Sequence, residues 1–281
     1  MKLRRVTAAS AAVLALAVAA TACGSDDKDD SSSSSSGGGD KKITIGIKFD
    51  QPGIGQKTPD GYAGFDVDVA TYVAKKLGYS EDQITWKEAK SADRETMLQR
   101  GDVDFIAASY SINDERAAKV DFAGPYLLAH QDVLIRSDDN SIKSPEDLNS
   151  KKLCSVTGST SAQNVKDKLA PKAQLQQYPT YSACLTGVQS GAIDALTTDD
   201  SILAGYASQA SFKGKFKLGG FKMTNENYGI GVKKGSDLKA KINTALEEMV
   251  SDKSWDKAVE ANFGPAEYKN EPAPKIGNVV K

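Results

Sequence analysis

The sequence predicts an α/β fold with largely parallel sheets, because segments with strand and helix periodicity alternate along most of the chain. Residues 42–47 alternate in polarity with the two-residue period of a strand. Residues 66–77 instead place their apolar side chains on one helical face, and Gly78 follows as a stop signal. Residues 41–281 comprise 241 residues, enough for one large domain or two lobes of ordinary size.

The later segments continue this alternation. Glycine follows two of the expected helices as a C-terminal stop, and Ser144 before Pro145 is typical of a helix start. We expect helices over residues 93–100, from 145, over 161–169, over 182–190 and around 238–249, and strands over 103–108, 153–156 and 192–196.

Two further strand-like segments, 133–135 and 228–232, enclose a complete α/β set that carries two cysteines. A chain that leaves one lobe, builds a second and returns would group 41–136 with 233–281 and set 137–232 apart. Two sequential domains are the alternative, and periodicity does not distinguish the two arrangements.

Residues 1–22 are typical of a secretory signal peptide. Lys2, Arg4 and Arg5 precede a short alanine-rich apolar stretch that ends in small residues before Cys23. A cysteine at this place resembles the lipobox of bacterial lipoproteins, in which it becomes the lipidated first residue and can carry palmitate. Ala20 departs from the leucine usual in that motif. A plain secretory signal with an incidental cysteine is the alternative.

Residues 23–40 are interpreted as the lipidated cysteine and a flexible linker. Residues 24–40 contain no apolar side chain, so burial cannot offset the entropy of ordering them. Seventeen residues of such a coil reach about 20–25 Å, which would hold a globular domain just off a membrane. No apolar run of 18 or more residues follows this linker.

The charge pattern gives no sign of a nucleic-acid partner. Removal of the signal peptide takes away three positive charges and no negative ones, so the net charge changes from −1 to −4. Both signs are mixed along the chain without a basic stripe, which argues against nucleic-acid binding.

Cys154 and Cys184 remain beyond the signal region. An even pair in an exported protein predicts a disulfide, here around a loop of about 30 residues. Two buried free thiols are the alternative. We do not expect thiol catalysis, because the single histidine, His130, is not placed near either cysteine by anything in the sequence.

Four sets of residues, in order along the chain, carry a family resemblance. They are GFDVDVA at 64–70, SYSINDER at 109–116 with VDFAGPY at 120–126, GST at 158–160, and IDALTTD at 193–199. They resemble solute-binding protein family 3, the amino-acid-binding proteins of ABC importers. The resemblance spans 41–265 and is closest to the glutamate-binding lipoproteins of high-GC Gram-positive bacteria, through KFDQPG at 48–53, LCSV at 153–156 and NYGIG at 227–231.

The resemblance implies a two-lobed periplasmic-binding-protein-like fold (type II), with two hinge strands and the ligand in the cleft between the lobes. It therefore favours the discontinuous lobe over two sequential domains. Closure of the two lobes over a bridging ligand would be the mechanism.

The resemblance also implies roles for residues on both faces of the cleft. Arg116 would bind the ligand α-carboxylate through its planar guanidinium, with Ser111 as a second donor. Asp199 would neutralise the ammonium, helped by the carbonyl or hydroxyl of Ser109, and Asp200 is the weaker candidate. Without the motif, Arg116 would be taken as an ordinary surface residue. Asp199 follows a buried strand, where clefts in α/β lobes hold ligands, and a solvated pair of loop acids is the alternative.

Thr160 and Ser159 precede the helix expected from Ser161. Free backbone N–H groups, the helix dipole and two hydroxyls suit a carboxylate at this place. Thr160 could also act simply as the N-cap.

Arg94, Lys48 and Ser91 match positions that hold the distal carboxylate in acidic-amino-acid binders, and solvent exposure is the alternative for the two cations. Tyr181, with Phe49 and Gln51, is expected to line the cleft. An unpaired basic pair would cost about 2–4 kcal/mol with an amide ligand, whereas one methylene changes binding by about 1–3 kcal/mol. The preference for an acid over glutamine therefore has a stronger basis than the preference for glutamate over aspartate.

The predicted protein is a monomeric binding subunit, lipid-anchored on the extracytoplasmic face of the cell membrane. Its partners would be L-glutamate or a related acidic amino acid and the permease and ATPase of an ABC importer. We expect no catalytic residue, metal or cofactor. The alternatives are a binder of glutamine or aspartate, an amino-acid sensor, or an enzyme on the same fold, such as a dehydratase or a lytic transglycosylase module.

Overall fold

The computed structural model describes residues 41–280, so the predicted signal peptide, Cys23 and linker lie outside the described residues. The strands are β1 (Ile43–Ile47), β2 (Asp50–Gln51), β3 (Gly55–Thr58), β4 (Gly61–Ala63), β5 (Ile84–Glu88), β6 (Phe105–Ile106), β7 (Asp121–Arg136), β8 (Lys152–Val156), β9 (Gln174–Tyr178), β10 (Ala195–Asp199), β11 (Phe216–Leu218) and β12 (Asn225–Val232).

The helices alternate with these strands as the periodicity predicts. They are α1 (Phe65–Lys76), α2 (Arg94–Arg100), α3 (Asp114–Ala117), α4 (Thr160–Asn164), α5 (Tyr181–Ser190), α6 (Asp200–Ser208), α7 (Leu238–Ser251) and α8 (Ser254–Phe263), with short helical turns at Glu81–Gln83, Pro145–Ser150, Val165–Leu169 and Gly264–Ala266. Among the helices of residues 41–280, none combines the length and apolar character needed to cross a bilayer.

The main sheet of the described residues has the strand order β5-β1-β6-β12-β7-β10-β8-β9, with β11 paired to β7. Strands β5, β1 and β6 are parallel, and so are β10, β8 and β9. Strands β12 and β7 run antiparallel to each other and join the two parallel sets. The α/β class predicted from the sequence is therefore confirmed, with an antiparallel pair at its centre.

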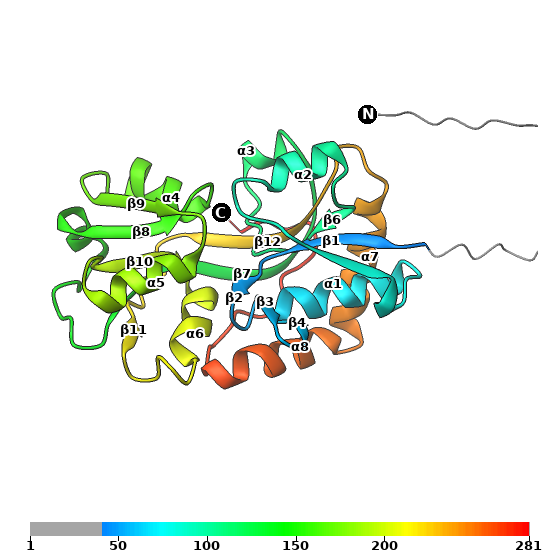
Figure 1. Ribbon diagram of the computed structural model, residues 1–281. Helices are drawn as coiled ribbons and strands as arrows, with labels where there is room; N and C mark the ends of the chain where they lie inside the picture. Colours follow the sequence, from blue (N-terminus) through cyan, green and yellow to red (C-terminus); the bar gives the residue numbers. More distant parts are fainter. Residues whose placement is uncertain (1–40, 281) are drawn as a thin grey trace, which may run out of the picture. The chain divides into compact units, whose positions relative to one another are not determined.

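Strand β7 pairs with β12 through its first part and with β10 through its second part. Residues 121–130 pair with β12, and residues 131–135 pair with β10. Figure 1 shows β7 and β12 side by side across the middle, between the group of α4, α5 and α6 and the group of α1, α7 and α8. These two strands are where the hinge strands are expected. The lobe limits of 41–136 with 233–281, and 137–232, stay a prediction.

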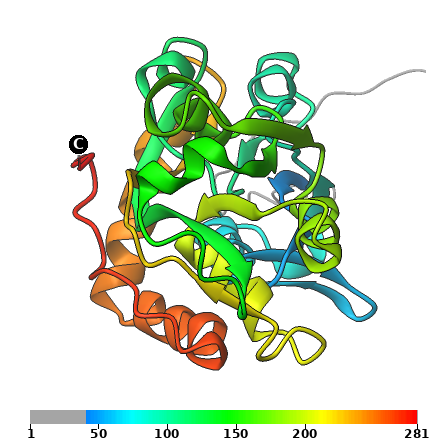
Figure 2. The ribbon, with the colours of Figure 1, turned by 90° about the vertical axis from the view of Figure 1, so that its left-hand side faces the viewer.

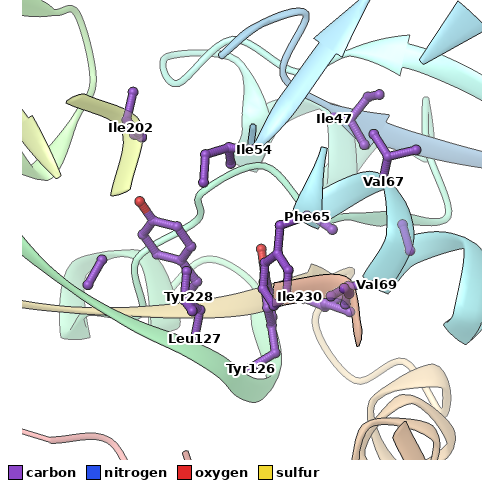
Figure 3. Close-up of a cluster of buried hydrophobic side chains, with 14 of the residues drawn as sticks. Ile47, Ile54, Phe65, Val67, Val69, Tyr126, Leu127, Ile202, Tyr228 and Ile230 are labelled. Carbon is purple, nitrogen blue, oxygen red and sulfur yellow. The ribbon is translucent and has the colours of Figure 1, made fainter. Parts of the chain in front are cut away.

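Large apolar side chains pack where the central strands meet α1 and α8. The Phe65 ring lies 6.0 Å from Trp255 and 5.1 Å from Phe263, measured between ring centroids. Tyr126 of β7 and Tyr228 of β12 project into the same cluster, with their rings 6.2 Å apart (Figure 3). Both tyrosines are buried, and their hydroxyls reach site residues described below.

The predicted disulfide is present. Cys154 of β8 and Cys184 of α5 are bonded, with their Cα atoms 5.6 Å apart, and both are fully buried. The bond fixes α5 against the parallel strand β8.

The C-terminal segment leaves α8 and returns to the central strands (Figure 2). The Val280 N–H donates to the Asn227 side chain at 2.9 Å, and the Asn227 amide donates to the Val280 carbonyl at 2.8 Å. Gly277 donates to the Gly124 carbonyl of β7. The segment therefore binds both central strands along their outer side.

Candidate ligand-binding site

Asp66, the first acid of the GFDVDVA segment, holds the backbone of the site. Its carboxylate accepts hydrogen bonds from the Ser109 N–H and the Tyr126 hydroxyl, both at 2.6 Å. Ser109 has a φ of 43°, a conformation that costs energy for a residue with a side chain. Burial raises the pKa of Asp66 to about 6. Asp66 is thus a positioning residue that stabilises the turn at Ser109.

Arg94 and Arg116 share one aromatic ring. Their guanidinium carbons lie 4.1 Å and 5.2 Å from the centroid of Tyr110, within the range of a cation–π contact. Arg94 also donates to the carbonyls of Ala108 and Ser109. Burial and then the charge of Arg116 lower the pKa of Arg94 to about 10. Tyr110 was not predicted, although it stands between Ser109 and Ser111 in the motif.

Arg116 connects two distant segments of the chain. Its Nη1 donates to the Ser111 carbonyl at 2.8 Å, and its Nη2 donates to the Gly158 carbonyl at 2.9 Å. Its Nε lies 3.5 Å from a carboxylate oxygen of Glu95. The guanidinium is buried, so it is held in place before any carboxylate ligand reaches it.

Lys48 and Arg94 are buried cations, and no residue of 41–280 forms an ion pair with either of them. Only 1% of Lys48 and 2% of Arg94 is exposed, which excludes the solvent-exposed alternative. Among residues 41–280, Lys48 Nζ and Arg94 Nε have no hydrogen-bond partner, and neither side chain has a carboxylate oxygen within 4.0 Å. Burial lowers the pKa of Lys48 to about 8; the charge of Asp50 opposes this shift and that of Arg94 adds to it.

Asp199 is a buried carboxylate at the end of β10 and the start of α6. Its carboxylate accepts from the Tyr228 hydroxyl at 2.6 Å and from the Ser161 hydroxyl at 3.3 Å. Burial, and after it the charge of Glu226, raises the pKa of Asp199 well above its usual range. A buried carboxylate in this position suits a cationic partner.

Glu226 of β12 is a second buried carboxylate, which the sequence did not predict. One oxygen accepts from the Thr160 hydroxyl at 2.9 Å. The other accepts from the Thr224 hydroxyl at 2.8 Å and the Asn164 amide at 3.4 Å. A single acid before the NYGIG segment carries no motif. Its only signal is that Glu226 and Tyr228 are two residues apart and so share one face of the strand.

The start of α4 differs from the prediction by one residue. The Ser159 hydroxyl accepts from the Ala162 N–H at 3.0 Å and is the N-cap. The suggestion that Thr160 acts as the N-cap is therefore wrong, and the helix begins at Thr160 itself. This leaves the Thr160 hydroxyl in contact with Glu226 and 3.4 Å from the Ser111 hydroxyl.

Two other predicted residues, Ser91 and Tyr181, also lie near this group. Ser91 lines a cavity of about 320 Å³ together with Arg116, Ser159 and Thr160. The ring of Tyr181 is buried, with Lys48 Nζ 5.7 Å from its centroid.

Gln51 is buried and accepts from the Ser109 hydroxyl at 3.1 Å. Phe49 is only partly buried and packs against Tyr62 at 5.1 Å between centroids. Asp200 accepts from the His130 N–H and the Tyr268 hydroxyl, so its carboxylate is directed toward a different group of residues from that of Asp199.

The group therefore combines three cations, Lys48, Arg94 and Arg116, with two carboxylates, Asp199 and Glu226, nearly all of them excluded from water. Charges buried in this way need partners of opposite sign. The arrangement suits a small ligand that carries both anionic and cationic groups.

Comparison with known proteins supports this interpretation. The family of bacterial extracellular solute-binding proteins, family 3, matches residues 43–265. Glutamate-binding protein GluB of Corynebacterium efficiens is 48% identical over 79% of this chain and 79% of its own. The ABC transporter glutamine-binding protein GlnH of Bacillus subtilis is 41% identical over 76% of this chain and 78% of its own.

Among solved structures, an ancestral arginine-binding protein bound to glutamine superposes with a TM-score of 0.74 at 36% identity, over 80% of this chain and 98% of that one. These proteins are named for binding and not for a reaction. The chain is accordingly a binding protein rather than an enzyme.

Proposed function

The chain belongs to the bacterial extracellular solute-binding proteins of family 3, and on this basis we propose that it is the amino-acid-binding subunit of an ABC importer. Its preferred ligand would be an acidic amino acid, L-glutamate first. The relatives named for glutamate binding, at 48% and 47% identity, support this choice.

The observation that carries the proposal is the burial of Lys48 and Arg94 without a carboxylate partner in the described part of the chain. Removing a charge from water costs several kcal/mol unless an opposite charge compensates it. The distal carboxylate of glutamate would supply that charge. Ser91 would add a hydroxyl donor, and Tyr181 would cover the side-chain methylenes.

The other end of the ligand would meet the remaining site residues. Arg116 and the Ser111 hydroxyl would bind the α-carboxylate, with the Thr160 hydroxyl and the Ser159 end of α4 beside it. Asp199 and the Ser109 carbonyl would hold the ammonium. Arg116 donates to the Gly158 carbonyl, next to Ser159 and Thr160, which supports this assignment.

Ligand capture would proceed by closure of two lobes. Lys48, Arg94 and Arg116 belong to the predicted first lobe, whereas Thr160 and Asp199 belong to the second. A ligand that contacts both stabilises the closed arrangement over an open one. X-ray scattering with and without glutamate tests this, and an unchanged radius of gyration at saturation would contradict it.

Glutamine is the second candidate, because a relative named for glutamine binding shares 41% identity. An amide would leave Lys48 and Arg94 without an anion. We expect this to weaken binding by about 10- to 100-fold relative to glutamate.

Isothermal titration of the exported chain, from Cys23 to Lys281, with glutamate, aspartate and glutamine tests the assignment. Tight one-to-one binding of glutamate, at least about tenfold weaker for glutamine, is the expected result. Equal or better binding of glutamine would retain the family and remove the distal carboxylate role of Lys48 and Arg94.

The chain would act on the extracytoplasmic face of the cell membrane, anchored through lipid on Cys23, and would pass its ligand to a permease and its ATPase. The cysteine directly after small residues and the polar residues 24–40 support this anchor. Mass spectrometry of the mature N-terminus tests it, since an unmodified or uncleaved Cys23 would refute the anchor.

A further inference from the structure

Asp199 and Glu226 belong to one wall of the site. Consecutive residues of α4 hold them, because the Thr160 hydroxyl donates to Glu226 and the Ser161 hydroxyl donates to Asp199. Tyr228 follows Glu226 by two residues, on the same face of β12, and its hydroxyl donates to Asp199 at 2.6 Å. The two carboxylates are thus fixed by one short helix and one strand.

Neither carboxylate has a cationic partner within the described range 41–280, where no Lys, Arg or His nitrogen lies within 4.0 Å of either. Their donors are the neutral hydroxyls and amide described above. Exposed fractions of 4% for Asp199 and 3% for Glu226 exclude compensation by bulk water. Two neighbouring buried anions repel each other, so a cation brought by the ligand would stabilise both.

We propose that Glu226, together with Asp199, determines specificity by requiring a free ammonium group on the ligand. This inference rests on the proposed function and adds the rejection of dicarboxylates that lack an amine. Such compounds match the two carboxylates of glutamate and would otherwise fit the three cations as well as glutamate does.

The balance of charge gives the physical reason. The five buried groups assigned to the ligand, Lys48, Arg94, Arg116, Asp199 and Glu226, sum to +1, and Arg116 is also paired with the partly exposed Glu95. Glutamate carries −1 and brings an ammonium for the two carboxylates, whereas glutarate carries −2 and leaves both protein carboxylates unpaired. Asp66 is left out of this sum, because we assign it to positioning the turn at Ser109 and not to the ligand.

The test compares Glu226→Gln with the unmodified exported chain by titration with glutamate and with glutarate. Glutamine at this position removes the charge and keeps an oxygen that can accept from Thr160, while its NH2 group replaces the oxygen that accepts from Thr224 and Asn164. We expect glutamate binding to weaken by about 10- to 100-fold and glutarate binding to stay equal or to strengthen. The preference for glutamate over glutarate should therefore fall at least about tenfold.

A purely structural role for Glu226 would weaken both ligands by the same factor, and that result would overturn the inference. Asp200→Asn is the matched control, because its carboxylate faces His130 and Tyr268, and it should keep the preference. If Glu226→Gln does not fold, the unmodified chain still decides: equal affinity for glutamate and glutarate would refute a requirement for the ammonium.

If the proposed preference for glutamate is wrong, the titrations give a different result. If the chain binds glutamine and not glutamate, the same variants are titrated with glutamine and with glutaramate, its analogue without the amine. A loss of preference for glutamine in Glu226→Gln would then support the inference although the acidic ligand is wrong. Absence of binding to either amino acid would overturn both.

Discussion

The guanidinium carbon of Arg94 lies 4.1 Å from the centroid of the Tyr110 ring, and the same ring carries Arg116 at 5.2 Å. One aromatic side chain thereby positions both arginines that we assign to the two carboxylates of the ligand. Like charges repel, so holding two guanidinium groups close together requires compensation. The electron-rich ring provides part of it.

Replacement of Tyr110 by Leu should therefore lower affinity for glutamate more than for a ligand that uses one arginine. Each cation–π contact in a desolvated site contributes about 0.5–2 kcal/mol, so we expect a loss of about 10- to 100-fold. Tyr110→Phe keeps the ring and should change affinity by less than about threefold. Titration calorimetry measures both, and equal losses in the two variants would show that the hydroxyl, not the ring, matters.

Lys48 should make glutamate binding depend on pH. Burial lowers its pKa to about 8, and the charged form is the one that binds a carboxylate. In the ligand-free protein, Lys48 loses its proton as the pH rises through 8, so affinity should fall about tenfold between pH 7 and pH 9. Titrations at both pH values measure this. In Lys48→Met, only the smaller change due to the ammonium of the ligand should remain.

The same substitution should stabilise the protein without ligand. The folded pKa lies below the unfolded value of 10.5, so the unfolded state binds more protons between pH 8 and 10.5. The free energy of unfolding therefore increases with pH over that window. Below pH 8 the buried charge of Lys48 destabilises the folded state by its full cost. Lys48→Met should recover up to about 3 kcal/mol at pH 7. Denaturant unfolding that shows Lys48→Met to be less stable would contradict this.

The fold class could be predicted from the sequence because each element carries its own signal. Strand alternation in β1 and the helical face of α1 depend on residues only a few positions apart. The disulfide was predictable from the even number of cysteines beyond Cys23. The pairing of one long strand, β7, with both β12 and β10 was not, since each half pairs with a strand that lies far away in the sequence.

The site could be predicted only where a motif carries it. Arg116 and Asp199 stand in recognisable segments, and the structure brings them into one buried group. Glu226 enters that group because β12 pairs antiparallel with β7, opposite Ala129, and this contact has no local signature. Tyr110 has the apolar periodicity of a core residue. Its role depends on two arginines that reach its ring from other elements.

The disulfide between Cys154 and Cys184 should contribute substantially to stability. The bonded residues are separated by 30 positions. Closing such a loop lowers the entropy of the unfolded chain and so raises its free energy by about 3–4 kcal/mol. The double variant Cys154→Ser, Cys184→Ser should lose about that amount in denaturant unfolding. If the unmodified chain loses the same free energy of unfolding under reducing conditions, the disulfide is confirmed as the cause. An unchanged midpoint would contradict it.

Gly205 of α6 provides a test of closure, because it belongs to the predicted second lobe and its close neighbour, Pro52, belongs to the predicted first lobe. A Cβ atom at Gly205 would overlap the carbonyl oxygen of Pro52. Alanine favours the helix itself by up to about 1 kcal/mol, so Gly205→Ala should harm only the arrangement in which α6 meets Pro52. We expect weaker glutamate binding and a larger radius of gyration at saturation, with a melting temperature close to that of the unmodified chain.

Gly187→Ala is the control, since its Cβ would meet Ile193 within the neighbouring loop. It should lower the melting temperature and leave closure intact. If Gly205→Ala binds and compacts normally, α6 and Pro52 do not approach each other in the ligand-bound state, and closure must use another contact.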